Sequence, residues 1–449
     1  MADFTVSNAF RQPSGAAKRR AERLHIGVWI FIGSLVWPAS LAFQVGTLNM
    51  QIYKFALVAL VPLIVIEMAR NPIRLRAPDY LMLAFGFLQG AITVYHHGLT
   101  QEFLVYSYVV PIASIGWENI GITGMEYLVP YFTARAFIRT KGQLISVIKI
   151  LIWLALGISF FTWIEATTKF SVFQLGTSSY IEERLGFYRS AGPFPGPIQW
   201  GFFASSLFAL SLSQATGMDK RDKGKVLIVL LLLGAVFTSL SSAAFMAVAL
   251  QIGLTAYLVM SARLNRRWLY LSLAVVFAYL FVDLLSNRTP VHVFFSYATL
   301  NPWTGYYRLL IWDFGWQNFL TSPIVGIGFN NWFRAHWMTA SIDAYWLVLL
   351  MRYGLLGTVP LALAILTAMR LVGRSIESEE IKFPISVAAA WSFSIVSIIV
   401  VGFTVHHFGH ALILMTFFLG LWGALANRTE GTRQAVRLEF DHAAPYPGA

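Results

Sequence analysis

Cysteine is absent from this 449-residue chain, and charged residues are scarce. The absence of cysteine excludes disulfides and metal sites built on thiolates. Charged residues make up only 12% of the sequence, against roughly 25% in a typical soluble domain. So little charge argues against the two or three soluble domains that the length alone would allow. The abundant residues, rather than the scarce ones, indicate the class of the protein.

Hydrophobic residues make up 57% of the chain. Apolar runs of about 17 to 25 residues recur along it, and each is long enough to cross a hydrocarbon core of roughly 30 Å as a helix. We therefore predict an all-α polytopic membrane protein with about twelve spans. The predicted spans lie near residues 25–45, 53–69, 79–96, 112–136, 143–164, 196–215, 225–241, 243–260, 268–286, 343–371, 385–404 and 409–426.

The net charge of +12 is distributed in a pattern that indicates topology. Basic loops such as ARNPIRLRAP, RAFIRTKGQ and SARLNRR alternate with loops almost free of Lys and Arg. By the positive-inside tendency, the basic loops and both termini are cytoplasmic. We predict a basic cytoplasmic tail at 1–24, a membrane domain at 25–426 and a cytoplasmic tail at 427–449. Topology accounts for the charge, so we predict no nucleic-acid partner.

Two loops on the predicted outer side contain arginine, at about 165–195 and 287–342. The second, between spans 9 and 10, is the longest hydrophilic stretch in the chain. It is rich in aromatic residues, as in NPWTGYYRLLIWDFGWQNFL, which is not typical of disorder. We predict short helices on the membrane surface there, with aromatic rings at headgroup level.

The first loop ends in RLGFYRSAGPFPGPIQWG, which places Arg184 and Arg189 just before a span. Proline at a helix entry needs no intrahelical donor, so the helix can begin there with free N–H groups facing outward. Free N–H groups beside arginines suit an anion such as phosphate. The alternative is a rigid elbow whose arginines reach lipid headgroups.

The second loop carries Arg308 on an apparent amphipathic helix, where it is either a substrate ligand or a headgroup contact. Further along, Arg334, His336 and Asp343 precede an apolar helix that contains Arg352. Asp343 is the stronger candidate for a proton acceptor, with His336 as the alternative. Asp343 is otherwise an N-cap, and His336 an interfacial ring. Arg352 is read as structural, because a charge near the bilayer centre costs at least roughly 2.5–3.5 kcal/mol unless it has a partner.

No metal site and no cofactor are predicted. The adjacent pairs His96–His97 and His406–His407 stand at span ends, and adjacent histidines on a helix point about 100° apart, so they rarely share a metal. The spacing GIG at 326–328 is too short for a nucleotide-binding signature and does not follow a strand.

Taken in order, these stretches resemble the O-antigen ligase and O-antigen polymerase superfamily of bacterial envelope glycosyltransferases. The resemblance covers about residues 180–372. It is carried by the arginine and Gly/Pro-rich span entry, by YYRLLIW with SPIVGIGFNNW, and by DAYWLVLLMRYGLLG. It implies a GT-C-like helical body in the bacterial inner membrane. The active site would lie at the outer face and would use neither metal nor nucleotide.

The resemblance also implies roles for single residues. Arg189 and Arg308 would clamp the pyrophosphate of a glycan carried on undecaprenyl pyrophosphate, with Arg184 and Arg334 as further candidate ligands. The family often carries a His-Asn pair where this chain has Asp343-Ala344. That histidine is the proposed base of the ligases, so its replacement favours a polymerase, with Asp343 or His336 as the base.

We therefore predict a polysaccharide polymerase that joins lipid-linked repeat units of an exopolysaccharide, capsule or O-antigen. The alternative within the family is an O-antigen ligase that transfers glycan to lipid A core. The alternative from another class is a secondary transporter or a flippase for lipid-linked sugars, which twelve spans also suit. Expected partners are the lipid-linked oligosaccharide, membrane lipids and a chain-length regulator or export complex.

Overall fold

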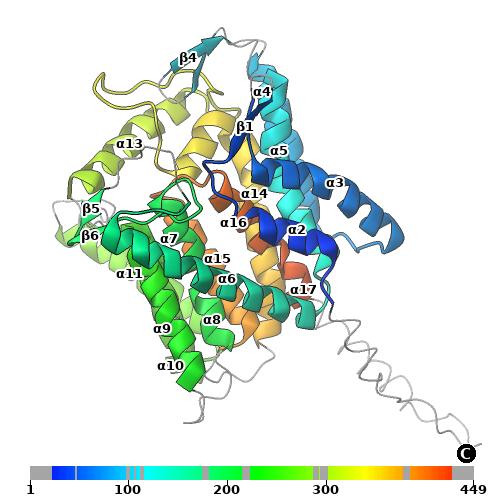
Figure 1. The fold of residues 1–449 in the computed structure, drawn as a ribbon. Helices are drawn as coiled ribbons and strands as arrows, with labels where there is room; N and C mark the ends of the chain where they lie inside the picture. The colour runs from blue at the N-terminus through cyan, green and yellow to red at the C-terminus, as the bar shows by residue number, and fades with distance from the viewer. Residues whose placement is uncertain are drawn as a thin grey trace, which may run out of the picture.

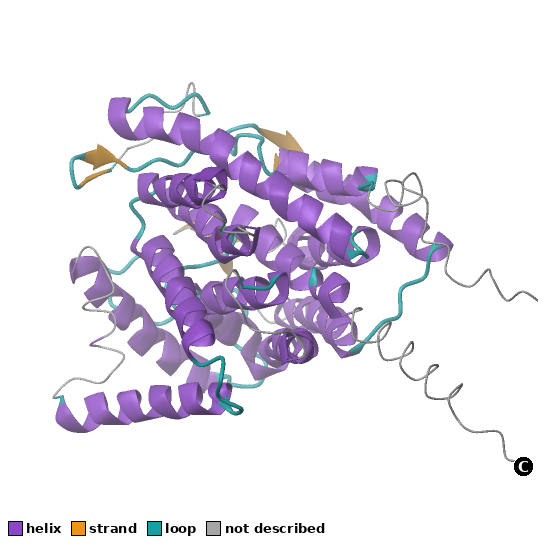
Figure 2. Cartoon of the chain, turned by 90° about the horizontal axis from the view of Figure 1, so that it is seen from below, coloured by secondary structure: helices purple, strands orange, loops and turns teal. Residues whose placement is uncertain are grey.

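The computed structural model describes residues 23–45, 48–97, 102–105, 108–111, 116–173, 182–214, 223–286, 293, 302–377 and 385–426. Most of these residues are helical (Figures 1 and 2). The predicted tails lie almost wholly outside this part of the chain, as do residues 174–181 and most of 287–301. The predominantly helical body confirms the coarse fold class.

The helices, in chain order, are α2 (Ile26–Ser34), α3 (Ile52–Arg70), α4 (Ala77–His97), α5 (Gly116–Phe137), α6 (Lys141–Thr168), α7 (Pro197–Ser206), α8 (Phe208–Gln214), α9 (Lys223–Thr238), α10 (Ser242–Met260), α11 (Arg267–Leu285), α13 (Pro302–Thr321), α14 (Tyr345–Glu377), α15 (Val387–Val401), α16 (His410–Gly420) and α17 (Trp422–Ala426). Three antiparallel hairpins supplement them: β1 (Ala42–Val45) with β2 (Leu48–Gln51), β3 (Glu102–Val105) with β4 (Tyr108–Pro111), and β5 (Glu183–Arg184) with β6 (Phe187–Tyr188).

Six of the described helices are long and apolar enough to cross a membrane: α3, α4, α6, α10, α11 and α14. Each of the twelve predicted spans contains at least one helix, but several are too short to be counted by the same measure. The first predicted span, 25–45, is helical only over the nine residues of α2, and β1 follows it. The span predicted at 196–215 is divided into α7 and α8 by a turn at Leu207. The number twelve therefore stays a prediction.

Hydrogen bonds join several connecting segments that are distant in sequence. Among the loops predicted to face inward, Arg139 Nη2 donates to the carbonyl of Asn71, and Gln143 Nε2 donates to the carbonyl of Arg23. The N–H of Ala39, which falls within the first predicted span, donates to the carbonyl of Pro193 in the loop predicted at 165–195. In Figure 1 the labelled strands and α13 lie along the upper and left rim of the helical body.

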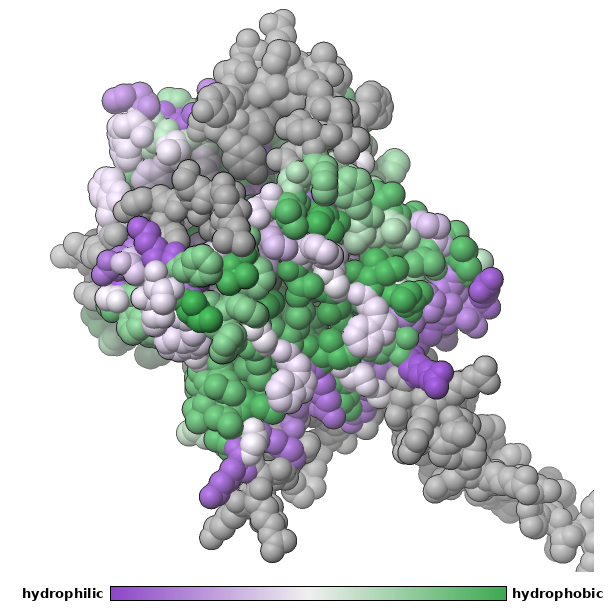
Figure 3. Space-filling view, viewed as in Figure 1, coloured by the Kyte–Doolittle hydropathy of each residue, from purple (hydrophilic) through white to green (hydrophobic). Residues whose placement is uncertain are grey.

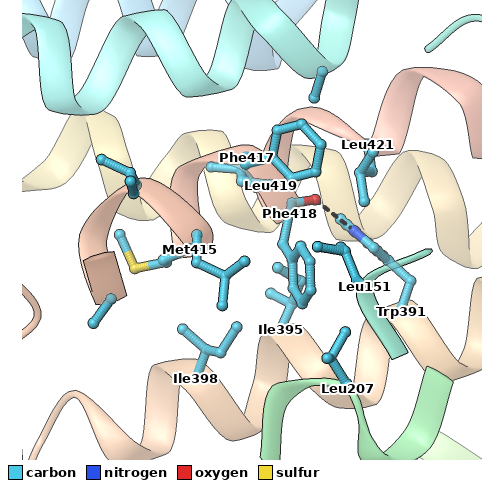
Figure 4. Close-up of a cluster of buried hydrophobic side chains, with 14 of the residues drawn as sticks. Leu151, Leu207, Trp391, Ile395, Ile398, Met415, Phe417, Phe418, Leu419 and Leu421 are labelled. Carbon is cyan, nitrogen blue, oxygen red and sulfur yellow. Dashed lines mark hydrogen bonds between the residues drawn. The ribbon is translucent and has the colours of Figure 1, made fainter. Parts of the chain in front are cut away.

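The apolar surfaces of the helices are used in two ways. Inside, α6, α15 and α16 meet around large side chains, and Trp391 Nε1 donates a hydrogen bond of 2.7 Å to the carbonyl of Phe418 (Figure 4). Outside, the middle of the face seen in Figure 3 is predominantly hydrophobic, and hydrophilic residues gather towards its rims. Exposed Trp153 and Phe160 on α6 belong to this outer surface. A hydrophobic band of this kind fits a body surrounded by lipid.

The charges that interrupt the fourth predicted span all have partners, as far as their side chains are described. Arg135 donates from Nε and Nη2 to the two carboxylate oxygens of Asp79, at 2.7 and 3.0 Å, and Tyr131 Oη donates to the same carboxylate. Asp79 is fully buried. Glu126 accepts a 2.6 Å hydrogen bond from Tyr53 Oη. Paired in this way, the charges join α5 to α3 and α4, consistent with a membrane-embedded helix.

Helix α14 is broken at Gly354, where φ is 61° and ψ is −165°. The segment SPIVGIG, residues 322–328, docks at the break. Ile327 and Gly328 donate N–H groups to the carbonyls of Met351 and Arg352, and Leu355 and Leu356 donate to Pro323 and Ile324. A side chain on Gly326 would begin 2.5 Å from the Arg352 backbone, so only glycine fits there. The GIG glycines therefore serve backbone packing.

Arg352 thus lies at a helix break and not in the middle of a continuous helix. Its guanidinium carbon stands 4.5 Å from the centre of the Phe329 ring, a cation–π distance. This agrees with the structural reading of Arg352 and explains how a charge is tolerated within a long apolar helix.

Candidate functional site

Arg184 and Arg189 are presented by the β5–β6 hairpin. Its two-residue turn, Leu185–Gly186, has positive φ at both positions (53° and 77°), which is the geometry of a tight type I′ hairpin. Leu185 adopts this conformation without the freedom of glycine, and its side chain is exposed. The hairpin places the two arginines on either side of the turn, close to each other.

Glu182 joins the two arginines. Its Oε1 accepts a hydrogen bond from Arg184 Nε and its Oε2 accepts one from Arg189 Nη1, each at 2.7 Å. Burial tends to raise the pKa of Glu182, but the hydrogen bonds and charges of the two arginines outweigh it and hold the pKa below its ordinary value. Glu182 is therefore ionised at neutral pH. It is not among the site residues predicted from the sequence.

The turn between α9 and α10 supports both guanidinium groups from the other side. Arg189 Nε donates to the carbonyl of Ser239 at 3.3 Å, and Arg184 Nη1 donates to the carbonyl of Leu240 at 3.4 Å. These carbonyls stand at the C-terminal end of α9, where a helix carries partial negative charge. The arginines are thus anchored by backbone oxygens in addition to Glu182.

The Gly/Pro elbow after Arg189 is clamped to the end of α6. Glu165 receives the N–H of Ala191 on Oε1 and the N–H of Gly192 on Oε2, both at 3.1 Å. Ser190 Oγ donates to the carbonyl of Thr162 at 2.7 Å. The predicted elbow is therefore confirmed as a structural element. The N–H groups of residues 191 and 192 bind an internal carboxylate and are not free for a ligand.

Arg308, on α13, comes from a distant part of the sequence and joins the same cluster. Its side chain is half-buried, and its Nε is buried without a hydrogen-bond partner. Burial lowers the pKa of Arg308 from its ordinary value. The charge of Asp343 opposes this shift, while the charges of Arg184 and Arg189 add to it. The charges of Asp343, Arg184 and Arg189 therefore all reach Arg308, and the excess of positive charge there favours an anion.

Asp343 is exposed just before α14, where Ser341 Oγ donates to its Oδ1 at 3.4 Å. Two of the first N–H groups of α14 have backbone acceptors: the N–H of Tyr345 donates to the carbonyl of Val405, and the N–H of Trp346 donates to the carbonyl of Gly402. Capping by Asp343 is not needed for those two groups. The carboxylate is accessible from outside and lies within electrostatic reach of Arg308, as a proton acceptor near the arginines would require.

The two remaining candidates lie in the loop between α13 and α14. His336 is exposed, next to Trp337. Arg334 is occupied by its own loop: it donates from Nη1 to Asn331 Oδ1 at 2.5 Å and from Nε to the carbonyl of Met338 at 3.2 Å. Its guanidinium also lies 5.4 Å from the centre of the Trp332 ring. These contacts stabilise the loop, whereas Arg184 and Arg189 share Glu182 and their charges reach Arg308.

Within the part of the chain that the structure describes, no group of three or more His, Asp or Glu side chains could hold a metal ion. The chemistry available at the cluster is that of guanidinium and carboxylate groups. It can bind a multiply charged anion, and the exposed carboxylate can accept a proton.

No protein-family model matches this chain, and no curated protein matches it.

Proposed function

We propose that this chain is a polysaccharide polymerase with a GT-C-like fold in the bacterial inner membrane. It transfers glycan repeat units from undecaprenyl pyrophosphate to a growing chain at the outer face. The observation that carries the proposal is Arg308, whose Nε is buried without a partner while the charges of two further arginines act on it and only Asp343 opposes them. Such an arrangement is costly unless an anion binds there. The charge and shape of a pyrophosphate suit three guanidinium groups.

The proposed reaction uses the arginines and Asp343 in different roles. The oxygen of an acceptor hydroxyl forms a bond to the anomeric carbon of the donor sugar, and the bond from that carbon to the pyrophosphate oxygen breaks. Arg189 and Arg308, with Arg184, stabilise the charge that develops on the leaving pyrophosphate. Asp343 accepts the proton of the hydroxyl. Undecaprenyl pyrophosphate leaves with the electron pair of the broken bond.

A secondary transporter is the second candidate, and the broken helix α14 is the observation that favours it. Transporters often place substrate sites where a membrane helix is interrupted. Here, however, the interruption at Gly354 is filled by the backbone of residues 322–328. Arg308, whose Nε lacks a partner, lies in a different segment and is within the electrostatic influence of Asp343. We therefore rank the enzyme above the transporter.

The test is polymer formation in cells that carry single substitutions. Arg308→Ala and Arg189→Ala should each abolish polymer at an unchanged protein level, and Asp343→Asn should do so without a change in side-chain size. Arg263→Ala is the matched control, because Arg263 is an exposed arginine in a basic loop predicted to face the cytoplasm. Normal polymer in both arginine variants would refute the pyrophosphate clamp.

Polymerase and ligase are separated by the product that accumulates in a deletion strain. Single lipid-linked repeat units indicate a missing polymerase. Long lipid-linked chains that are not attached to lipid A core indicate a missing ligase.

A further inference from the structure

The arginine pair of the β5–β6 hairpin has an anion of its own in Glu182. The two oxygens of its carboxylate bridge Arg184 Nε and Arg189 Nη1 at 2.7 Å each. Oxygens of a pyrophosphate would use the same donors, because arginine binds carboxylate and phosphate oxygens through the same planar N–H groups. Nothing in the transfer reaction described above accounts for this carboxylate.

We propose that Glu182 is an exchangeable anion of the site: its carboxylate holds Arg184 and Arg189 in the empty protein and gives up these donors to the pyrophosphate of the donor lipid. The inference rests on the proposed function, since it assigns the anion for which Glu182 is exchanged. It makes Glu182 a positioning residue that competes with the substrate, and not a catalytic residue.

The contacts allow Glu182 to leave while the arginines stay. Ser239 and Leu240 hold the two guanidinium groups through separate N–H groups. The side chains of Arg189 and Arg184 are 11% and 21% exposed, whereas that of Glu182 is 39% exposed and can turn into water. The N–H of Arg189 donates to the backbone carbonyl of Glu182 at 2.9 Å, so the hairpin stays closed when the side chain moves.

The balance of charge explains why a pyrophosphate displaces the carboxylate. Glu182 carries one negative charge and serves two arginines, and no hydrogen bond joins it to Arg308 among the described residues. A pyrophosphate carries more negative charge than a carboxylate, so it binds the same guanidinium donors more strongly. Arg308, whose Nε is buried without a partner, adds a further attraction for an anion of higher charge. The freed carboxylate regains its hydration, which lowers the cost of the exchange.

The experiment measures binding of two probes, inorganic pyrophosphate and undecaprenyl pyrophosphate, to the purified full-length protein in lipid nanodiscs. Glu182→Gln keeps the size of the side chain and removes the competing charge. We expect both probes to bind about two- to fivefold more tightly, the range of a partly exposed ion pair. Glu182→Ala should change affinity in the same direction. Glu183→Gln is the matched control, since the neighbouring exposed Glu183 makes the same change in charge and should leave affinity as in the wild type.

The sign of the change decides between exchange and simple support. If Glu182 only braces the arginines, both of its variants bind the probes more weakly than the wild type. Weaker or unchanged binding in Glu182→Gln overturns the inference, while the proposed function stands as long as Arg308→Ala abolishes binding. If the wild type binds neither probe, or Arg308→Ala binds as the wild type does, the proposed function itself fails.

Discussion

The clamp between Glu165 and the elbow at residues 191–192 gives a sharp test of how the arginine site is positioned. Glu165→Gln changes one oxygen to an NH2 group and leaves the shape of the side chain almost unaltered. In the folded protein both oxygens accept backbone N–H groups at 3.1 Å, so either orientation of the amide places its NH2 against an N–H donor. One hydrogen bond is lost, and its backbone donor is left without a partner.

The magnitude follows from the chemistry of that contact. A hydrogen bond to a charged group contributes about 1.5–3 kcal/mol, and a buried donor left unpaired costs about 1–3 kcal/mol. The two contributions describe the same contact and are not added, so we expect the elbow to lose about 2–3 kcal/mol of local stability. Arg189 lies two residues before Ala191, so its guanidinium should lose its fixed position. Under the proposed function, polymer formation should fall by about 30- to 160-fold, the equivalent of that loss.

The assay is polymer yield at matched protein level, together with the thermal unfolding midpoint of the purified protein. Glu183→Gln is again the control, because it makes the same chemical change on an exposed side chain of β5. An unchanged unfolding midpoint and full polymer yield in Glu165→Gln would refute the view that this carboxylate positions the elbow.

Two further predictions concern the membrane body. Gly354→Ala should sharply lower the yield of folded protein, because the new methyl group would collide with the carbonyl of Ile324 and the residue would be strained at a φ of 61°. Gly373→Ala is the control: it lies in the same helix with open space around it and should be tolerated. Equal yields of the two variants would contradict the break in α14. Arg135→Ala should destabilise the protein by about 3–5 kcal/mol, because it leaves the buried carboxylate of Asp79 without its counter-charge. The double variant Asp79→Leu/Arg135→Met removes both charges and should recover part of that loss in the same unfolding measurement. A single variant as stable as the wild type would show that the pair is not needed.

Local patterns were sufficient to predict most of the helices. The run predicted at 243–260 is α10, which begins at Ser242, and the aromatic stretch of the outer loop is the helix α13. Both follow from local properties, because the length of an apolar run and the spacing of its side chains are read along one segment. The elbow after Arg189 was also predictable, because proline restricts the φ angle and glycine widens the range of φ and ψ, whatever the tertiary surroundings are.

Contacts between residues distant in sequence could not be predicted from local patterns. Glu165 is the first residue of the loop predicted at 165–195, and nothing in TWIEATTKF indicates that its carboxylate binds the backbone of residues 191 and 192. Glu182 gave a weak local signal, as a carboxylate two residues before Arg184, but the bridge to Arg189 depends on the register of the hairpin. The break in α14 likewise depends on SPIVGIG docking from another segment.

By itself, the sequence determined that this chain has the character of a helical membrane protein, where its apolar segments lie and which of the loops between them carry arginine. These properties are sums over neighbouring residues, and hydrophobicity and charge act on each segment separately. Only the tertiary structure decided that Arg184 and Arg189 share a carboxylate, that the Nε of Arg308 is buried without a partner, and that Arg334 binds within its own loop. Electrostatic partnership falls off with distance in space, and that distance is set by how the helices pack.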